Sequence, residues 1–133
     1  MKTIQLLNEK NHFLEKFYSL NEKQLIQLSS SQFENIEEFY NQREDILNII
    51  KYIDAELSRT QTNEIAMNIA VSSSDQTAVK EGLRIKDIYV NRILEQDIQI
   101  ISLIEKLKTD IINELKLVRG ARRAMAGYKS NML

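Results

Sequence analysis

Side-chain chemistry needs nucleophiles, acid–base groups or metal ligands in suitable arrangements, and this chain offers few. His12 is the only histidine and cysteine is absent, so no cluster supports a zinc site or nucleophilic catalysis. The acidic pairs Glu37 with Glu38 and Glu44 with Asp45 join neighbouring residues, which point apart on a helix. The three glycines stand alone and form no phosphate-binding loop. We therefore expect a protein that is not an enzyme and that uses no metal or cofactor.

Two charged residues occupy positions where the surrounding pattern requires apolar side chains. Arg43 and Asp97 each replace an apolar residue in a helical stripe, and a lone buried charge costs about 3–5 kcal/mol. We expect an interhelical ion pair between them that fixes the register of the second and third helices. Asp54 is a competing acid, and the alternative is an Arg43 side chain that reaches solvent along its own stem.

Charge is distributed unevenly along the chain. Residues 116–133 carry five basic groups and no acidic group, whereas residues 1–115 have a net charge of −6. Cations that complement a helix dipole account for Lys116 and Arg119 but not for the others. We interpret the basic tail as a surface for an acidic or amphipathic partner. The predicted partner-binding residues are Arg119, Arg122, Arg123, Met125 and Tyr128.

Other partners and compartments fit the sequence less well. An acidic chain repels phosphates, so nucleic acid is not expected as a partner. No segment approaches the ~20 apolar residues of a membrane span, and the first residues turn polar too soon for a signal peptide. Together with the absence of cysteine, this predicts a cytoplasmic protein that does not insert into a membrane.

The composition favours long helices. Proline is absent among the 133 residues, and the three glycines are too few for the many tight turns of a β-sandwich or barrel. We expect an all-α fold, an elongated antiparallel bundle of three long helices, with residues 1–133 forming one domain.

Apolar residues at steps of three, four and seven predict the first helix from Thr3 to Leu28. A capping box at Ser19 and Glu22 is the competing interpretation, which would split this helix.

A second capping box, at Ser31 and Glu34, places the start of the second helix near Gln32. Its stripe is the most regular heptad in the chain: Ile36, Phe39, Arg43, Ile46, Ile50, Ile53 and Leu57. The pattern weakens after Arg59, where we expect the helix to fray or bend.

The segment Ser72–Asp75 is typical of a loop or a helix cap, and the third helix is expected to begin near Gln76. Its stripe is Val90, Ile93, Asp97, Ile100, Ile104, Leu107, Ile111 and Val118, with Leu115 beside it. The pattern leaves open whether the helix ends near Gly120 or continues to about Tyr128 as a short extension.

The chain resembles the small helical chaperones of flagellar type III export, of the FliT and FlgN type. The stretches that carry the resemblance are Ser31–Ile36, Arg43–Leu47, Ile93–Asp97, and Gly120–Ala124 followed by Tyr128. The FliT-like, filament-cap branch fits better because an Ile-Leu-x-x-Asp stretch precedes a basic, tyrosine-bearing tail.

The resemblance implies a chaperone or adaptor that binds a late flagellar substrate, either a filament-cap or a hook-associated protein, and hands it to the export apparatus. It also implies that the last helix controls these contacts, through Arg122, Arg123 and Tyr128. The alternative is a structural coiled-coil protein that self-associates through its heptad stripes, and the sequence leaves a homodimer open.

Overall fold

The protein, analysed as a computed structural model, is all-α. The structure describes the backbone of residues 1–67 and 69–132 and the side chains of residues 1–67 and 69–127. Within these residues it contains three helices and no strand: α1 (Lys2–Ser29), α2 (Ile36–Ala66) and α3 (Ser73–Met132). The predicted helical fold class is confirmed.

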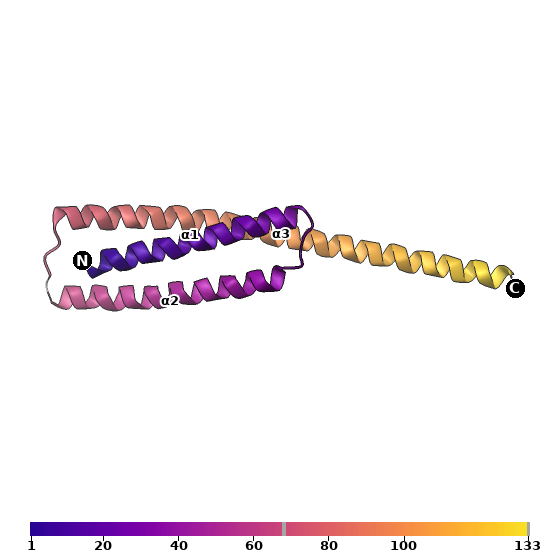
Figure 1. The fold of residues 1–133 in the computed structure, drawn as a ribbon, viewed down its shortest axis with the longest axis horizontal. Helices are drawn as coiled ribbons and strands as arrows, with labels where there is room; N and C mark the ends of the chain where they lie inside the picture. The colour runs from indigo at the N-terminus through magenta and orange to yellow at the C-terminus, as the bar shows by residue number, and fades with distance from the viewer. Residues whose placement is uncertain (68, 133) are drawn as a thin grey trace. The chain divides into compact units, whose positions relative to one another are not determined.

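The chain divides into two compact units. The first spans Met1–Ile100 and contains α1, α2 and the start of α3, and the second begins at Ile101 and consists of the rest of α3. In the first unit α1 and α3 run in one direction and α2 in the other (Figure 1). This unit is a three-helix bundle in which α2 is antiparallel to its two neighbours.

The first helix is unbroken through Ser19 and Glu22, so the capping box there does not split it. The second helix begins at Ile36, and its predicted start near Gln32 is wrong. Ser31 has a φ of 58°, and the N–H groups of Ser31 and Gln32 donate to carbonyls of the last turn of α1, at 3.0 and 2.8 Å. These two bonds form a Schellman motif. Ser31 therefore caps the C-terminus of α1 and cannot serve as the N-cap of α2.

Helix α2 stays regular to Ala66, beyond the weakening expected after Arg59. The serine-rich segment then caps α3: the Ser72 hydroxyl accepts a bond of 3.0 Å from the Asp75 N–H. This is an N-cap with an acidic residue in the first turn, and it starts α3 at Ser73, three residues before the predicted position.

The core of the first unit joins all three helices. Its buried cluster consists of Leu14, Phe17, Ile50 and Ile93. Close packing of α1 against α3 depends on Gly82, because a Cβ built there would lie 2.9 Å from Leu7 Cγ. The Asn11 side chain donates to the Gly82 carbonyl at 2.9 Å across the same contact.

In the second unit α3 continues as helix through Gly120 and Gly127 to Met132. Neither glycine has a positive φ. The helix therefore does not end near Gly120, and the basic tail from residue 116 onward is helical as far as the structure describes it.

Candidate partner-binding surface

Arg43 and Asp97 lie together between α2 and α3. Arg43 Nη2 is 2.9 Å from Asp97 Oδ2, and the two side chains are 22% and 24% exposed. The guanidinium also stacks 4.9 Å from the centre of the Phe17 ring. The competing acid, Asp54, pairs instead with Lys10 at 2.6 Å.

A buried amide network continues this pair into the α1–α3 interface. Asn21, which is fully buried, donates to Gln96 Oε1 at 3.1 Å and to Asp97 Oδ1 at 3.4 Å. Gln96 in turn donates to the Glu22 carboxylate at 2.7 Å and to the Tyr18 carbonyl at 3.1 Å. A helix shifted by one turn would lose these bonds and leave buried polar groups unpaired. The network fixes helix register, and its members have structural roles.

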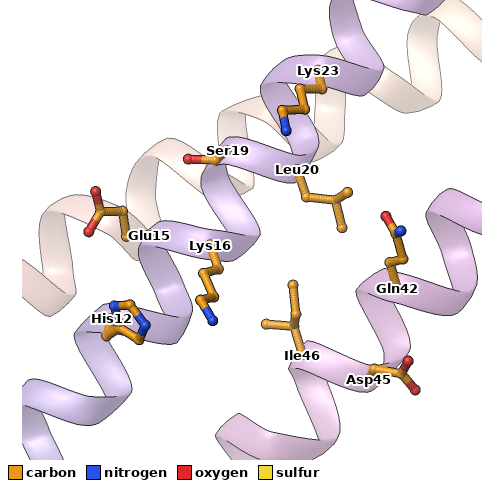
Figure 2. Close-up of a pocket in the computed structure, with 9 residues that line it drawn as sticks. All are labelled: His12, Glu15, Lys16, Ser19, Leu20, Lys23, Gln42, Asp45 and Ile46. Carbon is orange, nitrogen blue, oxygen red and sulfur yellow. The ribbon is translucent and has the colours of Figure 1, made fainter.

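A shallow groove of about 560 Å³ lies between α1 and α2 in the first unit. Figure 2 shows Leu20 and Ile46 facing one another across it, with several charged side chains on α1 and one, Asp45, on α2. The rim carries cations (Lys16, Lys23) and acids (Glu15, Asp45) in similar number, so the groove has no strong preference for either charge. His12 lines one end and packs edge-on against the Phe13 ring, 5.5 Å between centres.

The shifted pKa values belong to surface pairs within single helices. A hydrogen bond from Arg84 lowers the pKa of the Glu81 carboxyl and raises that of the Arg84 guanidinium. A hydrogen bond to Glu56 likewise raises the pKa of Arg59. These i,i+3 pairs lie in solvent, where screening leaves them little effect on helix stability. They do not form a reactive site.

The second unit has a different surface, because Ile104 and Leu107 are only half-buried and the later apolar residues among the described side chains are exposed. Ile100 is only 1% exposed, and none of the described side chains after it is buried. Yet the apolar pattern continues beyond Ile100 at steps of three or four residues. We call this set the apolar stripe: Ile104, Leu107, Ile111, Leu115 and Val118.

Charged residues flank the apolar stripe on its two sides. The cationic row (Lys116, Arg119 and Arg123) follows steps of three and four, which keeps it on one side of the stripe. Asp110 and Glu114 lie on the other side.

The remaining predicted partner-binding residues continue the stripe or lie beyond it. Arg122 and Met125 follow Val118 at steps of four and three, and Met125 is 61% exposed. The side chain of Tyr128 lies outside the residues whose side chains the structure describes. Among those that it does describe, no ion pair involves Arg119, Arg122 or Arg123.

Comparisons with protein-family models, curated proteins and solved structures found no significant match. The surface must therefore be interpreted from its own geometry.

Membrane-spanning helices and metal-binding clusters were sought among the same residues. In the described part of the chain, no helix combines the length and the apolar character needed to cross a membrane. No group of three or more histidine, aspartate or glutamate side chains there is close enough to hold a metal ion.

The sequence identified the stripe residues but not that Ile111, Leu115 and Val118 are exposed. The signal that could have revealed this is length: α1 and α2 have 28 and 31 residues, whereas α3 has 60. At about 1.5 Å per residue, a helix of 60 residues is twice as long as either partner. A stripe that continues along such a helix has more apolar positions than two helices of about half its length can match.

Proposed function

We propose that this protein is a non-enzymatic chaperone or adaptor that binds an amphipathic helix of a partner protein along the apolar stripe of its second unit. The observation that carries the proposal is that Ile100 is the last buried residue among the described side chains while the stripe continues to Val118, with Ile111, Leu115 and Val118 exposed. Helix-in-groove partners bind through apolar residues at steps of three and four, which is the spacing present here.

The size of the stripe suits reversible binding. Fully burying an exposed aliphatic side chain stabilises a complex by about 1.5–3 kcal/mol. Because the five stripe residues are already half-buried or about half exposed, together they contribute less than about 10 kcal/mol. Association itself costs about 4–15 kcal/mol. The apolar stripe alone therefore gives modest affinity, and electrostatic complementarity contributes to the choice of partner and to the association rate.

The resemblance to flagellar type III export chaperones supports a specific client. On this proposal the partner is a late flagellar substrate, a filament-cap or hook-associated protein, which the chaperone holds in the cytoplasm and hands to the export apparatus. The proposal fits a binding surface that can be vacated by competition, without any chemical step.

Self-association through the heptad stripes is the alternative function, and two observations disfavour it. The most regular heptad, on α2, is occupied within the first unit, where Phe39 is 3% and Ile53 1% exposed. The line of the apolar stripe also continues into a charged residue, Arg122, four residues after Val118. A parallel dimer would place Arg122 of both copies opposite one another.

The test compares two variants of the full chain, one with a double substitution in the stripe and one with a single control substitution. Ile111→Asp with Leu115→Asp places charges in the stripe, and Leu117→Asp is the matched control because Leu117 is 74% exposed and off the stripe. Calorimetric titration would use purified terminal segments of filament-cap and hook-associated proteins as ligands. We expect the wild type and the control to bind and the double variant to lose at least tenfold in affinity, about 1.4 kcal/mol.

Light scattering on the same samples tests the alternative. A monomer over the whole concentration range agrees with the proposal. A stable oligomer that the stripe substitutions dissociate, together with no binding to any flagellar segment, would refute it.

A further inference from the structure

We infer that the partner helix carries its carboxylates along one edge of its apolar face, where they meet the cationic row. This inference rests on the proposed function and specifies the chemistry of the client. It comes from the placement of charge around the stripe from Asp110 onward, which is cationic on one side and acidic on the other.

The cationic row is a set of like charges in close succession. Lys116, Arg119 and Arg123 are separated by three and four residues, the spacing at which like charges on a helix repel one another. No ion pair compensates them among the described side chains. A helix that brings carboxylates to this row relieves the repulsion as it binds.

Arg122 adds a requirement at the C-terminal end of the stripe. It follows Val118 in the stripe by four residues and precedes Met125 by three, so a bound helix would cover it. A guanidinium covered by an apolar side chain loses hydration without compensation, whereas a carboxylate would pair with it. The client helix therefore has an acidic residue near the end of its apolar face that meets Arg122.

The acidic edge of the stripe disfavours a client helix that carries its carboxylates on the other side of its apolar face. Asp110 and Glu114, four residues apart, flank the stripe on the side away from the row. Carboxylates of a client on that edge would face carboxylates, which lowers affinity. A neutral or basic edge there is tolerated, so the charge pattern also orients the bound helix.

A second copy of this chain fits the surface less well than an acidic helix does. Residues 116–133, which contain the row and Arg122, have no acidic residue. A parallel second copy therefore brings Arg122 of both copies against one another, with no carboxylate side chain in this segment to pair with them. Charge complementarity favours a different protein with an acidic amphipathic helix.

The experiment uses synthetic helical peptides as probes and the full chain as receptor. Four peptides share one composition, a leucine face with three glutamates, and differ in whether the glutamates lie near the N- or C-terminal end and on which edge. A fifth peptide has glutamine in place of glutamate. Affinities are measured by fluorescence anisotropy at low and at physiological salt.

For each direction of binding, only one of the four isomers brings its glutamates to the cationic row. We expect that isomer to bind about tenfold more tightly than its edge-swapped counterpart and than the glutamine peptide at low salt, the value that a few surface ion pairs contribute. Arg119→Glu with Arg123→Glu should abolish the difference. Lys106→Glu, on the far side of the helix, is the matched control and should retain it.

The outcomes separate the two proposals. Equal binding by all five peptides would overturn the inference about the client's edge and leave helix binding by the stripe intact. Binding by none of them would overturn the proposed function together with the inference. A wild-type dimer that Arg119→Glu with Arg123→Glu converts to monomer would overturn the acidic client in favour of a second copy.

Discussion

The two units of this chain use similar apolar periodicity for opposite purposes. In the first unit the stripe residues are covered, as Ile53 and Ile100 at 1% exposure illustrate, and the charges among them are paired. In the second unit the stripe residue Leu115 is 51% exposed, and the neighbouring cations have no counterpart among the described side chains. Periodicity alone therefore identifies a helix face that needs a partner, and packing decides whether that partner is already present.

The largest difference between the units should appear when buried and exposed isoleucines are truncated. Ile53→Ala removes a side chain from the closed core and should lower the free energy of unfolding by about 2–5 kcal/mol. Ile111→Ala, on the exposed stripe, should change it by less than about 0.5 kcal/mol. Urea denaturation followed by circular dichroism compares them. Equal losses would mean that the stripe is buried in the isolated protein.

The paired charge in the first unit gives the next largest effect. Arg43→Met leaves Asp97 partly buried and without its cation, which should destabilise the protein by about 2 kcal/mol, less than for a fully buried pair. Arg122→Met in the second unit breaks no ion pair within the described residues and should leave unfolding unchanged. A double variant, Arg43→Met with Asp97→Leu, should recover most of the loss. If Arg43→Met alone were neutral, the pair would have no role in register.

These two charged positions also show how far sequence reasoning extends. A charge in a regular heptad stripe predicts a specific partner, and Arg43 and Asp97 lie within hydrogen-bonding distance. The amide network around Asn21 and Gln96 is not foreseeable in the same way, because amides carry no charge that would single them out in the pattern.

The glycines of the two regions should respond in opposite directions to alanine. Gly82→Ala places a Cβ 2.9 Å from Leu7 Cγ, and the overpacking cost of about 1–3 kcal/mol exceeds the gain in helix propensity. A Cβ at Gly120 meets nothing within 4 Å, so Gly120→Ala should raise helix stability by up to about 1 kcal/mol. Thermal unfolding measures both. A stabilising Gly82→Ala would show that α1 and α3 leave room for a Cβ between Gly82 and Leu7.

The smallest predicted effect concerns the turn after α1, where the capping-box pattern predicted the wrong helix boundary. Ser31 adopts a left-handed backbone conformation at the end of α1, which glycine adopts without steric cost. Ser31→Gly should therefore stabilise the first unit by up to about 1 kcal/mol, with a rise in melting temperature. Ser30→Gly is the control, because the φ of Ser30 is −94° and glycine gains nothing there. A loss of stability in Ser31→Gly would favour the capping box instead.

The misassignment has a physical cause. A serine followed by glutamate three residues later satisfies the capping-box pattern, but the same serine can terminate the preceding helix. The two roles compete for one residue, and the hydrogen bonds of Ser31 and Gln32 back to α1 decide the outcome. Similarly, the end of α3 could not be placed from Gly120, because a glycine costs a helix only about 1 kcal/mol and neighbouring residues compensate for it.

Amide hydrogen exchange on the isolated full chain tests whether the apolar stripe stays exposed until a partner binds. We expect strong protection for core amides such as those of Ile50 and Ile93, and much weaker protection for Ile104–Val118 at concentrations where the protein is monomeric. Protection of Ile104–Val118 equal to that of the core would contradict this expectation, because the stripe would then already be covered within the isolated chain.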